Sequence, residues 1–185
     1  MIHVPSRVRA RELTRREALA ASLIGAALTA VCAQIAFYLP GNPVPVTMQV
    51  FAVLGCGLVL GGRLGALSQI EYLLAGAVGL PVFAGFKGGY VALAGPTGGY
   101  LVGFVLAALV VGSISEKMHR RTFAGLLAAC LLGVAAIYLL GRAWFAVWLG
   151  DVTGTRSWLL GVAPFVGLDA AKAALAAVLW GGKRS

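Results

Sequence analysis

Two ionisable side chains of opposite charge lie inside an otherwise apolar stretch near the end of the chain. Asp169 and Lys172 fall within residues 161–180. On a helix, a spacing of three residues puts both on one face. An ionisable group at a bilayer centre costs about 2.5–3.5 kcal/mol on insertion scales, so it is kept where it faces a cavity, a partner or another charge. The pair predicts a small-molecule site in a membrane protein, with a purely structural ion pair as the alternative.

The composition of the chain is that of an integral membrane protein. Of its 185 residues, 60% are hydrophobic and 11% are charged, and the mean hydropathy is +0.92. We interpret six apolar runs as membrane spans, at residues 17–39, 47–60, 64–79, 98–115, 122–140 and 164–179. We therefore expect an all-α integral membrane protein, with a basic cytoplasmic segment, 1–16, before a six-helix transmembrane substrate-binding domain, 17–182.

The net charge of +9 comes from basic residues that lie almost entirely between these runs. Six crossings leave both termini on one side, where eleven of the 15 Lys and Arg residues gather: Arg7, Arg9, Arg11, Arg15, Arg16, Arg63, Lys117, Arg120, Arg121, Lys183 and Arg184. Lys87, Arg142 and Arg156 fall on the other side. The positive-inside rule then predicts both termini in the cytoplasm of a multi-pass protein of the bacterial inner membrane. The pattern argues against a nucleic-acid partner.

Several kinds of chemistry have no residues to carry them. Cys32, Cys56 and Cys130 lie in three different runs without metal-ligand spacing, so we interpret them as apolar packing residues. His3 and His119 flank the runs, which leaves no intramembrane His for zinc or for a nucleophile's base. The GxxxxGK[ST] phosphate-binding pattern is missing, so any ATP is hydrolysed by another subunit. We expect no metal, no cofactor and no enzyme activity.

Small residues recur every four positions in the first run. One row holds Ala18, Ser22, Ala26 and Ala30, and a second holds Ala21, Gly25, Thr29 and Ala33. Small residues at this spacing let another helix approach closely in lipid. The row predicts either docking of a partner helix or packing inside this chain's own bundle, and the spacing does not decide between them.

Two connections between the runs are apolar and irregular. Residues 40–47 contain three prolines, which favour extended backbone over helix, so we expect an ordered lid. Residues 79–100 are rich in glycine and include Pro81 and Pro96. Irregular backbone at membrane depth survives where protein or a cavity satisfies its polar groups, so this segment is predicted to line an external pocket. Phe83, Tyr90 and Tyr100 offer flat faces to a ligand ring, although a Tyr at this level also suits a membrane interface.

Three stretches resemble the signature stretches of the BioY family, the biotin-binding S components of energy-coupling-factor (ECF) vitamin transporters. They are PVPVTMQ at 43–49, GLPVFAG at 79–85 and GPTGGY at 95–100. They occur in the family's order, and an Asp-x-x-Lys follows in the last run. The resemblance extends from Leu19 to Leu179.

The resemblance implies six helices and an outward-facing biotin pocket that is capped by the first loop and lined by Asp169 and Lys172. Biotin offers two ureido N–H donors, a ureido carbonyl and a carboxylate, so Asp169 can accept an N–H while Lys172 meets the carbonyl or the carboxylate. Further candidates for substrate binding are Thr47, Gln49, Tyr72, Phe83, Gly85, Gly89, Tyr90, Thr97, Gly98 and Tyr100. The family's partners are a transmembrane coupling protein and a pair of cytoplasmic ATPases, docked through an AxxxA motif that corresponds to Ala26 and Ala30. A homodimer is the other assembly to consider.

The chain departs from the family pattern in two places. Residues 164–169 read PFVGLD where the family has PFLPGD, which puts the start of the last helix in question. Glu71 stands where an apolar residue is expected, so it pairs with a cation or faces a partner, with a role in ligand binding as the less favoured alternative. Two other functions stay open: an S component for another vitamin, such as thiamin or riboflavin, and a small membrane enzyme acting on lipids. The enzyme would need clustered carboxylates, and apart from Glu17 at the very start of the first run, the runs hold only Glu71 and Asp169.

Overall fold

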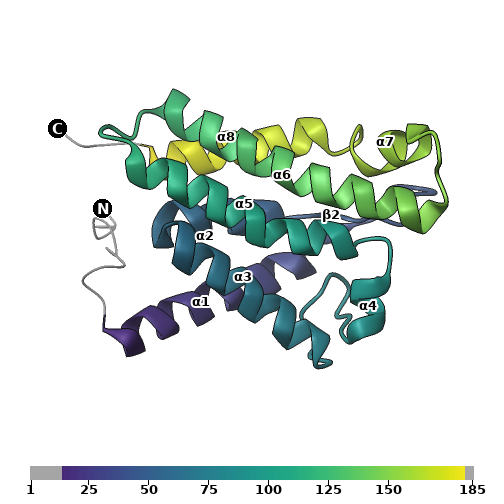
Figure 1. Ribbon diagram of the computed structural model, residues 1–185, viewed down its shortest axis with the longest axis horizontal. Coiled ribbons are helices and arrows are strands. Elements are labelled where there is room, and N and C mark those ends of the chain that lie inside the picture. Colours follow the sequence, from purple (N-terminus) through teal and green to yellow (C-terminus); the bar gives the residue numbers. More distant parts are fainter. Residues whose placement is uncertain (1–13, 182–185) are drawn as a thin grey trace.

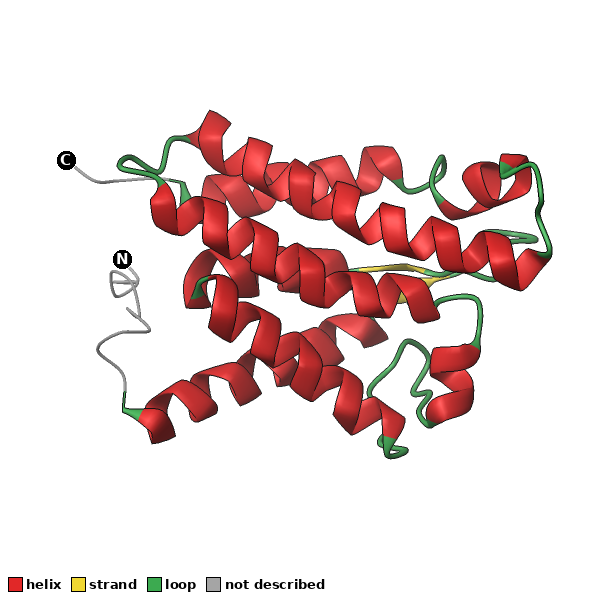
Figure 2. Ribbon diagram, viewed as in Figure 1, coloured by secondary structure: helices red, strands yellow, loops and turns green. Residues whose placement is uncertain are grey.

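The computed structural model describes residues 14–181, which form helices and one short pair of strands (Figures 1 and 2). The elements are α1 (Arg15–Gln34), β1 (Ala36–Phe37), β2 (Val46–Thr47), α2 (Gln49–Leu60), α3 (Gly62–Ala77), α4 (Tyr90–Ala94), α5 (Gly98–Lys117), α6 (Phe123–Leu149), α7 (Thr155–Gly161) and α8 (Val166–Trp180). Nearly all of the basic segment 1–16 lies outside the described residues, as do Lys183 and Arg184.

Each of the six apolar runs overlaps with one of the longer helices α1, α2, α3, α5, α6 and α8, which confirms an all-α membrane fold. By length and composition, α1, α5 and α6 can each cross a membrane, and α7 with α8 can do so as a pair bent by 48°. The apolar α2 has only 12 residues. Six crossings with both termini on one side therefore remain a prediction.

The ends of two helices follow local sequence signals. Thr14 and Glu17 form a capping box at the start of α1, in which each side chain accepts a hydrogen bond from the other residue's backbone N–H. Thr122 caps α6 by accepting from the backbone of Gly125. At its other end α6 stops at Gly150, which adopts the left-handed conformation with φ 63°.

Two predicted boundaries differ from the structure. The first run was expected to stay helical to residue 39, but α1 ends at Gln34 because the chain turns into β1, which pairs antiparallel with β2. The fifth run was expected to end at residue 140, but α6 continues to Leu149. The charge of Arg142 does not interrupt it, because its guanidinium lies against the Trp158 ring and donates to the carbonyl of Gly154 at 3.2 Å.

Helix α5 lies at the centre of the bundle, in contact with α2, α3 and α6, while α1 packs on α3 and α8 packs on α6 (Figure 1). Glycines make this close packing possible. A Cβ on Gly112 would overlap the backbone at Gly61 and Gly62, and a Cβ on Gly103 would press on the backbone of Ile137. In lipid, where hydrophobicity does not drive helices together, such close approach supplies the packing energy.

The two faces of α1 differ in residue size. Leu23, Ile24 and Val31 are exposed on the outside of the bundle, as expected for a surface against lipid tails. The small residues face inward: Ser22, Gly25, Thr29 and Ala33 are buried, Ala26 is 9% exposed, and Ala30 packs against the core. Within this chain, the small-residue rows therefore pack against neighbouring helices of the same bundle.

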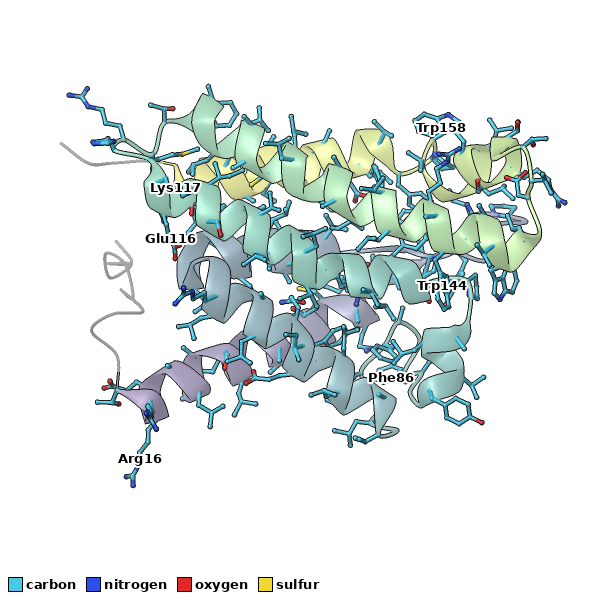
Figure 3. The ribbon with its side chains drawn as sticks, in the orientation of Figure 1. Arg16, Phe86, Glu116, Lys117, Trp144 and Trp158 are labelled. Carbon is cyan, nitrogen blue, oxygen red and sulfur yellow. The ribbon has the colours of Figure 1, made fainter. Side chains whose placement is uncertain are left out.

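The two ends of the bundle differ in chemistry. Figure 3 shows Arg16, Glu116 and Lys117 at one end and Phe86, Trp144 and Trp158 at the other. The α2–α3 junction, with Arg63, and the α5–α6 loop, with Arg120 and Arg121, belong to the first end (Figure 1). One end of the described chain is thus basic, and the other is rich in aromatic side chains.

Candidate ligand-binding site

A cavity of about 440 Å³ opens at the aromatic end of the bundle. This volume lies within the range of roughly 300–1,000 Å³ that is usual for small-molecule sites. Its wall is formed by the loop before α2, the loop between α3 and α4, the α4–α5 turn, and α2, α5, α6 and α8. The two irregular connections, residues 40–47 and 79–100, thus both line this cavity.

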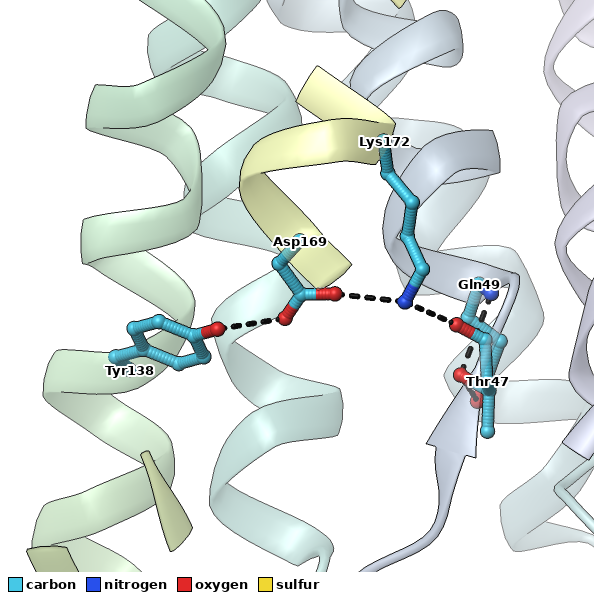
Figure 4. A network of polar contacts seen from close by, with 5 residues as sticks. All are labelled: Thr47, Gln49, Tyr138, Asp169 and Lys172. Carbon is cyan, nitrogen blue, oxygen red and sulfur yellow. Dashed lines mark hydrogen bonds and ion pairs between the residues drawn. The ribbon is translucent and has the colours of Figure 1, made fainter. Parts of the chain in front are cut away.

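The floor of the cavity holds a chain of hydrogen bonds (Figure 4). The Lys172 ammonium donates to Asp169 Oδ1 and to the carbonyl oxygen of Thr47, each at 2.7 Å. The Tyr138 hydroxyl donates to Asp169 Oδ2, also at 2.7 Å. Asp169 and Lys172 are 4% and 8% exposed, so the ion pair is nearly desolvated. A buried carboxylate held by a cation and a hydroxyl on separate helices is a rigid acceptor for a ligand donor.

The start of α8 positions this pair. Asp169 lies in the first turn of the helix, where the helix dipole favours a negative charge, and Lys172 follows one turn later. The PFVGLD sequence still begins a helix at Val166, and Phe165 turns into the cavity wall. Two hydrogen-bond donors of Lys172 are used inside the described chain. The third is left for a ligand, because an ammonium has three.

A second polar group faces the cavity from the start of α2. The Gln49 amide donates to the Tyr72 hydroxyl at 2.6 Å, and its oxygen accepts from the Thr47 hydroxyl at 3.1 Å. Tyr72 in turn donates to the carbonyl of Val82 at 3.2 Å. Gln49 lines the cavity, whereas Tyr72 lies behind it and is 1% exposed. Tyr72 therefore orients Gln49 and the α3–α4 loop from outside the cavity.

Aromatic rings form much of the remaining wall. Phe83 meets Tyr72 edge to face, with ring centroids 5.4 Å apart. Tyr100 donates its hydroxyl proton to the carbonyl of Gly161 at 2.8 Å. A Cβ on Gly141 would overlap the Tyr100 ring, so this ring lies in a slot with no room for a side chain on α6. These rings give the ligand an apolar and rigid surface.

The rim of the cavity carries a second cation. Lys87 lines the cavity but is exposed, with its ammonium 5.8 Å from the centre of the Tyr38 ring. The first loop covers this side. Asn42, which is buried, accepts from the backbone of Val44 at 2.9 Å and donates to the carbonyl of Leu160 at 2.7 Å. That second bond ties the loop to α7, 118 residues further along the chain.

The structure brings seven of the twelve candidate binding residues to the cavity wall, namely Thr47, Gln49, Phe83, Thr97, Tyr100, Asp169 and Lys172. The other five lie elsewhere. Tyr72 is behind Gln49, Tyr90 is 76% exposed at the start of α4, and Gly98 is buried at the start of α5. Gly85 and Gly89 have φ values of 73° and 86° in the α3–α4 loop, where they allow its turns.

Sequence reasoning missed three polar residues of the site: Tyr38, Lys87 and Tyr138. A Tyr inside an apolar run was the available signal for Tyr138, because a phenol in lipid needs a hydrogen-bond partner. Lys87 was counted only for its charge, and Tyr38 was read as part of the first span.

These features define a class: a small helical membrane protein whose cavity combines a buried ion pair with aromatic walls. Residues 6–184 match the model of the BioY family, and the chain belongs to this family. It is 43% identical over 153 residues to the probable biotin transporter BioY of Pyrococcus horikoshii, which covers 83% of this chain and 87% of the relative. It is 45% identical over 141 residues to the biotin transporter BioY of Thermotoga maritima, which covers 76% and 81%.

The fold also matches a solved structure. The crystal structure of an S-component for biotin from an ECF-type ABC transporter superposes with a TM-score of 0.79, over 91% of this chain and 92% of that one. The two sequences are 24% identical. The similarity supports an integral membrane fold for this chain.

Proposed function

We propose that this chain is the biotin-binding S component of an ECF-type ABC transporter, which captures biotin and passes it to the cytoplasm. Membership of the BioY family and the names of the relatives support biotin as the ligand. The observation that carries the assignment is the Asp169–Lys172 pair on the floor of an otherwise aromatic cavity. Biotin is a bicyclic urea with an apolar chain, so the ion pair can bind its ureido group while the aromatic walls pack against its rings and chain.

Two cations at different depths suggest the orientation of biotin. At the floor, Asp169 accepts a ureido N–H, and the remaining donor of Lys172 meets the ureido carbonyl. The apolar ring and chain then lie along Phe83 and Tyr100, and the carboxylate reaches the rim near Lys87. Asp169 and Lys172 at the floor are buried and Lys87 at the rim is exposed, so this arrangement keeps the charged end of biotin in the more polar surroundings.

The distribution of charge supports the direction of capture. The described basic end carries Arg15, Arg16, Arg63, Lys117, Arg120 and Arg121, and the positive-inside rule assigns such an end to the cytoplasm. The cavity then opens to the outside. Transport further requires a transmembrane coupling protein and cytoplasmic ATPases. Binding chemistry alone accounts for the residues of the site, so the chain acts as a transporter subunit and not as an enzyme.

Equilibrium binding of biotin to the purified protein tests the proposal, with thiamin and riboflavin as competing ligands. We expect selective biotin binding that Asp169→Asn and Lys172→Ala weaken by roughly tenfold to hundredfold, as for the loss of a hydrogen bond to a charged group, about 1.5–3 kcal/mol. The amount of folded protein in the membrane should change little. Binding of another vitamin in place of biotin would refute the ligand, and unchanged affinity in both variants would refute the site.

The proposed orientation of biotin in the cavity is tested separately, by comparing the binding of biotin with that of biotin amide. Lys87→Gln should weaken biotin several-fold and leave the uncharged amide unaffected, because only biotin carries the carboxylate. Lys172→Ala should weaken both ligands. If Lys172→Ala spares the amide and Lys87→Gln affects neither ligand, then biotin lies the other way round.

A further inference from the structure

A polar contact joins α1 and α3 away from the cavity. The Ser22 hydroxyl oxygen lies 2.8 Å from Glu71 Oε1, and the same oxygen lies 3.0 Å from the backbone carbonyl of Leu19. Ser22 is fully buried and Glu71 is partly buried. Neither residue lines the cavity, so the binding site does not account for this contact.

The hydrogen atoms available here do not suffice if Glu71 is ionised. A serine hydroxyl has one hydrogen, and both a carboxylate and a backbone carbonyl can only accept. If Glu71 is ionised, the Ser22 hydroxyl can donate either to the carbonyl of Leu19 or to Glu71. The Ser22 oxygen then lies within 3.0 Å of the remaining acceptor oxygen with no hydrogen between the two. One additional hydrogen makes both contacts favourable.

The second oxygen of Glu71 supports the same conclusion. Oε2 is buried and has no hydrogen-bond partner within the described part of the chain. The charged or titratable groups on the helices around this contact are Arg15, Arg16, Glu17 and Cys32 on α1, Cys56 on α2, Arg63 and Tyr72 on α3, Tyr90 on α4, and Tyr100, Glu116 and Lys117 on α5. None of these described groups bonds or ion-pairs with Glu71. Among residues 14–181, an anion at Glu71 would thus have neither a counter-ion nor a donor for Oε2.

We propose that Glu71 is a proton-binding site within the membrane, a neutral carboxylic acid that fastens α1 to α3. Its proton is on Oε1 and is donated to Ser22, and Ser22 donates to the carbonyl of Leu19. Oε2 is then the carbonyl oxygen of a neutral acid, which tolerates an apolar environment far better than half of an anion does. Without the proton, the single hydrogen of Ser22 can serve either Glu71 or the carbonyl of Leu19 but not both, so the link between α1 and α3 is weakened and depends on protonation.

Infrared spectroscopy of the full-length protein in lipid nanodiscs at neutral pH tests this directly. With glutamate carbon-13 labelled at the side-chain carboxyl, we expect the carbonyl band of a protonated acid, shifted by deuterium exchange and absent in Glu71→Gln. The control Glu116→Gln, which changes an exposed carboxylate at the basic end, should retain the band. A native protein without the band would overturn the proposal.

A second variant tests the bond itself. Ser22→Ala should keep the band and move it to higher frequency, because the acid loses its acceptor. A band that does not move would refute the contact with Ser22. Biotin affinity distinguishes a failure of this proposal from a failure of the proposed function. The Glu71→Gln variant should bind biotin like the native protein, because Glu71 lies outside the cavity.

Discussion

Tyr138 is the residue through which α6 takes part in the site. Its hydroxyl donates to Asp169 Oδ2, so the carboxylate is fixed by a neutral donor on one side and by Lys172 on the other (Figure 4). Without the hydroxyl, Asp169 Oδ2 would lose its donor, and the carboxylate could rotate towards the ammonium. The ligand would then meet a carboxylate that is no longer held in one orientation.

Tyr138→Phe should therefore weaken biotin binding by about tenfold, since a hydrogen bond to a charged group contributes about 1.5 kcal/mol or more. The phenylalanine ring retains the packing, so the melting temperature should change little. Calorimetric titration measures the affinity, and Tyr90→Phe on the exposed surface is the matched control. Equal affinities for native and Tyr138→Phe protein would show that Asp169 does not need this donor.

At this scale the sequence predicts the residues whose chemistry is unusual for their surroundings. Asp169 and Lys172 are conspicuous in an apolar run, and their spacing places them on one helix face. Tyr138 and Lys87 are not conspicuous, because their roles depend on which helix or loop lies opposite them. The bond from Lys172 to the Thr47 carbonyl spans 125 residues and exists only in the folded chain.

The Asn42 side chain is one of the groups that hold the first loop in place over the cavity. Asn42 holds the loop's own backbone through Val44 and holds α7 through Leu160. We predict that Asn42→Ala accelerates biotin release several-fold, measured by stopped-flow displacement. Asn42→Asp separates the two bonds, because it keeps the acceptor for Val44 and loses the donor to Leu160. Native-like release by Asn42→Asp would show that the tie to α7 is not needed.

The end of α3 positions an aromatic wall of the cavity. A Cβ on Gly76 would overlap the Phe83 ring, so Gly76→Ala must push Phe83 out of place. We expect a loss of about 1–3 kcal/mol in stability from overpacking, together with weaker biotin binding. The control Gly167→Ala adds a methyl with no atom within 4 Å. Thermal unfolding and binding should both distinguish the two variants, and identical results would contradict the close contact.

The long helices are predictable because a continuous apolar run has few alternatives in a bilayer. The short α4 and α7 and the β1–β2 pair are not, because their backbone is stabilised by distant partners. The Asn42–Leu160 bond for the first loop and the Trp144 indole donating to the carbonyl of Gly95 at the α4–α5 turn are examples. Neither bond leaves a pattern in the local sequence.

The described part of the molecule has a basic end and an aromatic end, and the proposed orientation in the membrane rests on this difference (Figure 3). One cysteine added to the α5–α6 loop or to the α6–α7 loop tests this orientation in intact cells. Val152→Cys, at a fully exposed position, should react with an impermeant maleimide, and His119→Cys should react only after permeabilisation. Cys32, Cys56 and Cys130 are buried, so the native chain is a suitable control. The opposite pattern of labelling would reverse the proposed topology.

The helices differ greatly in length, so the thickness of the bilayer should affect how they are arranged around the cavity. The 27 residues of α6 span about 40 Å, and the 12 residues of α2 span about 18 Å, against a hydrocarbon core of about 30 Å. A thinner bilayer favours a more tilted α6, while a thicker one leaves more of α2 short of the surface. Tyr138 lies on α6 and Gln49 begins α2, so hydrophobic mismatch acts on two walls of the cavity.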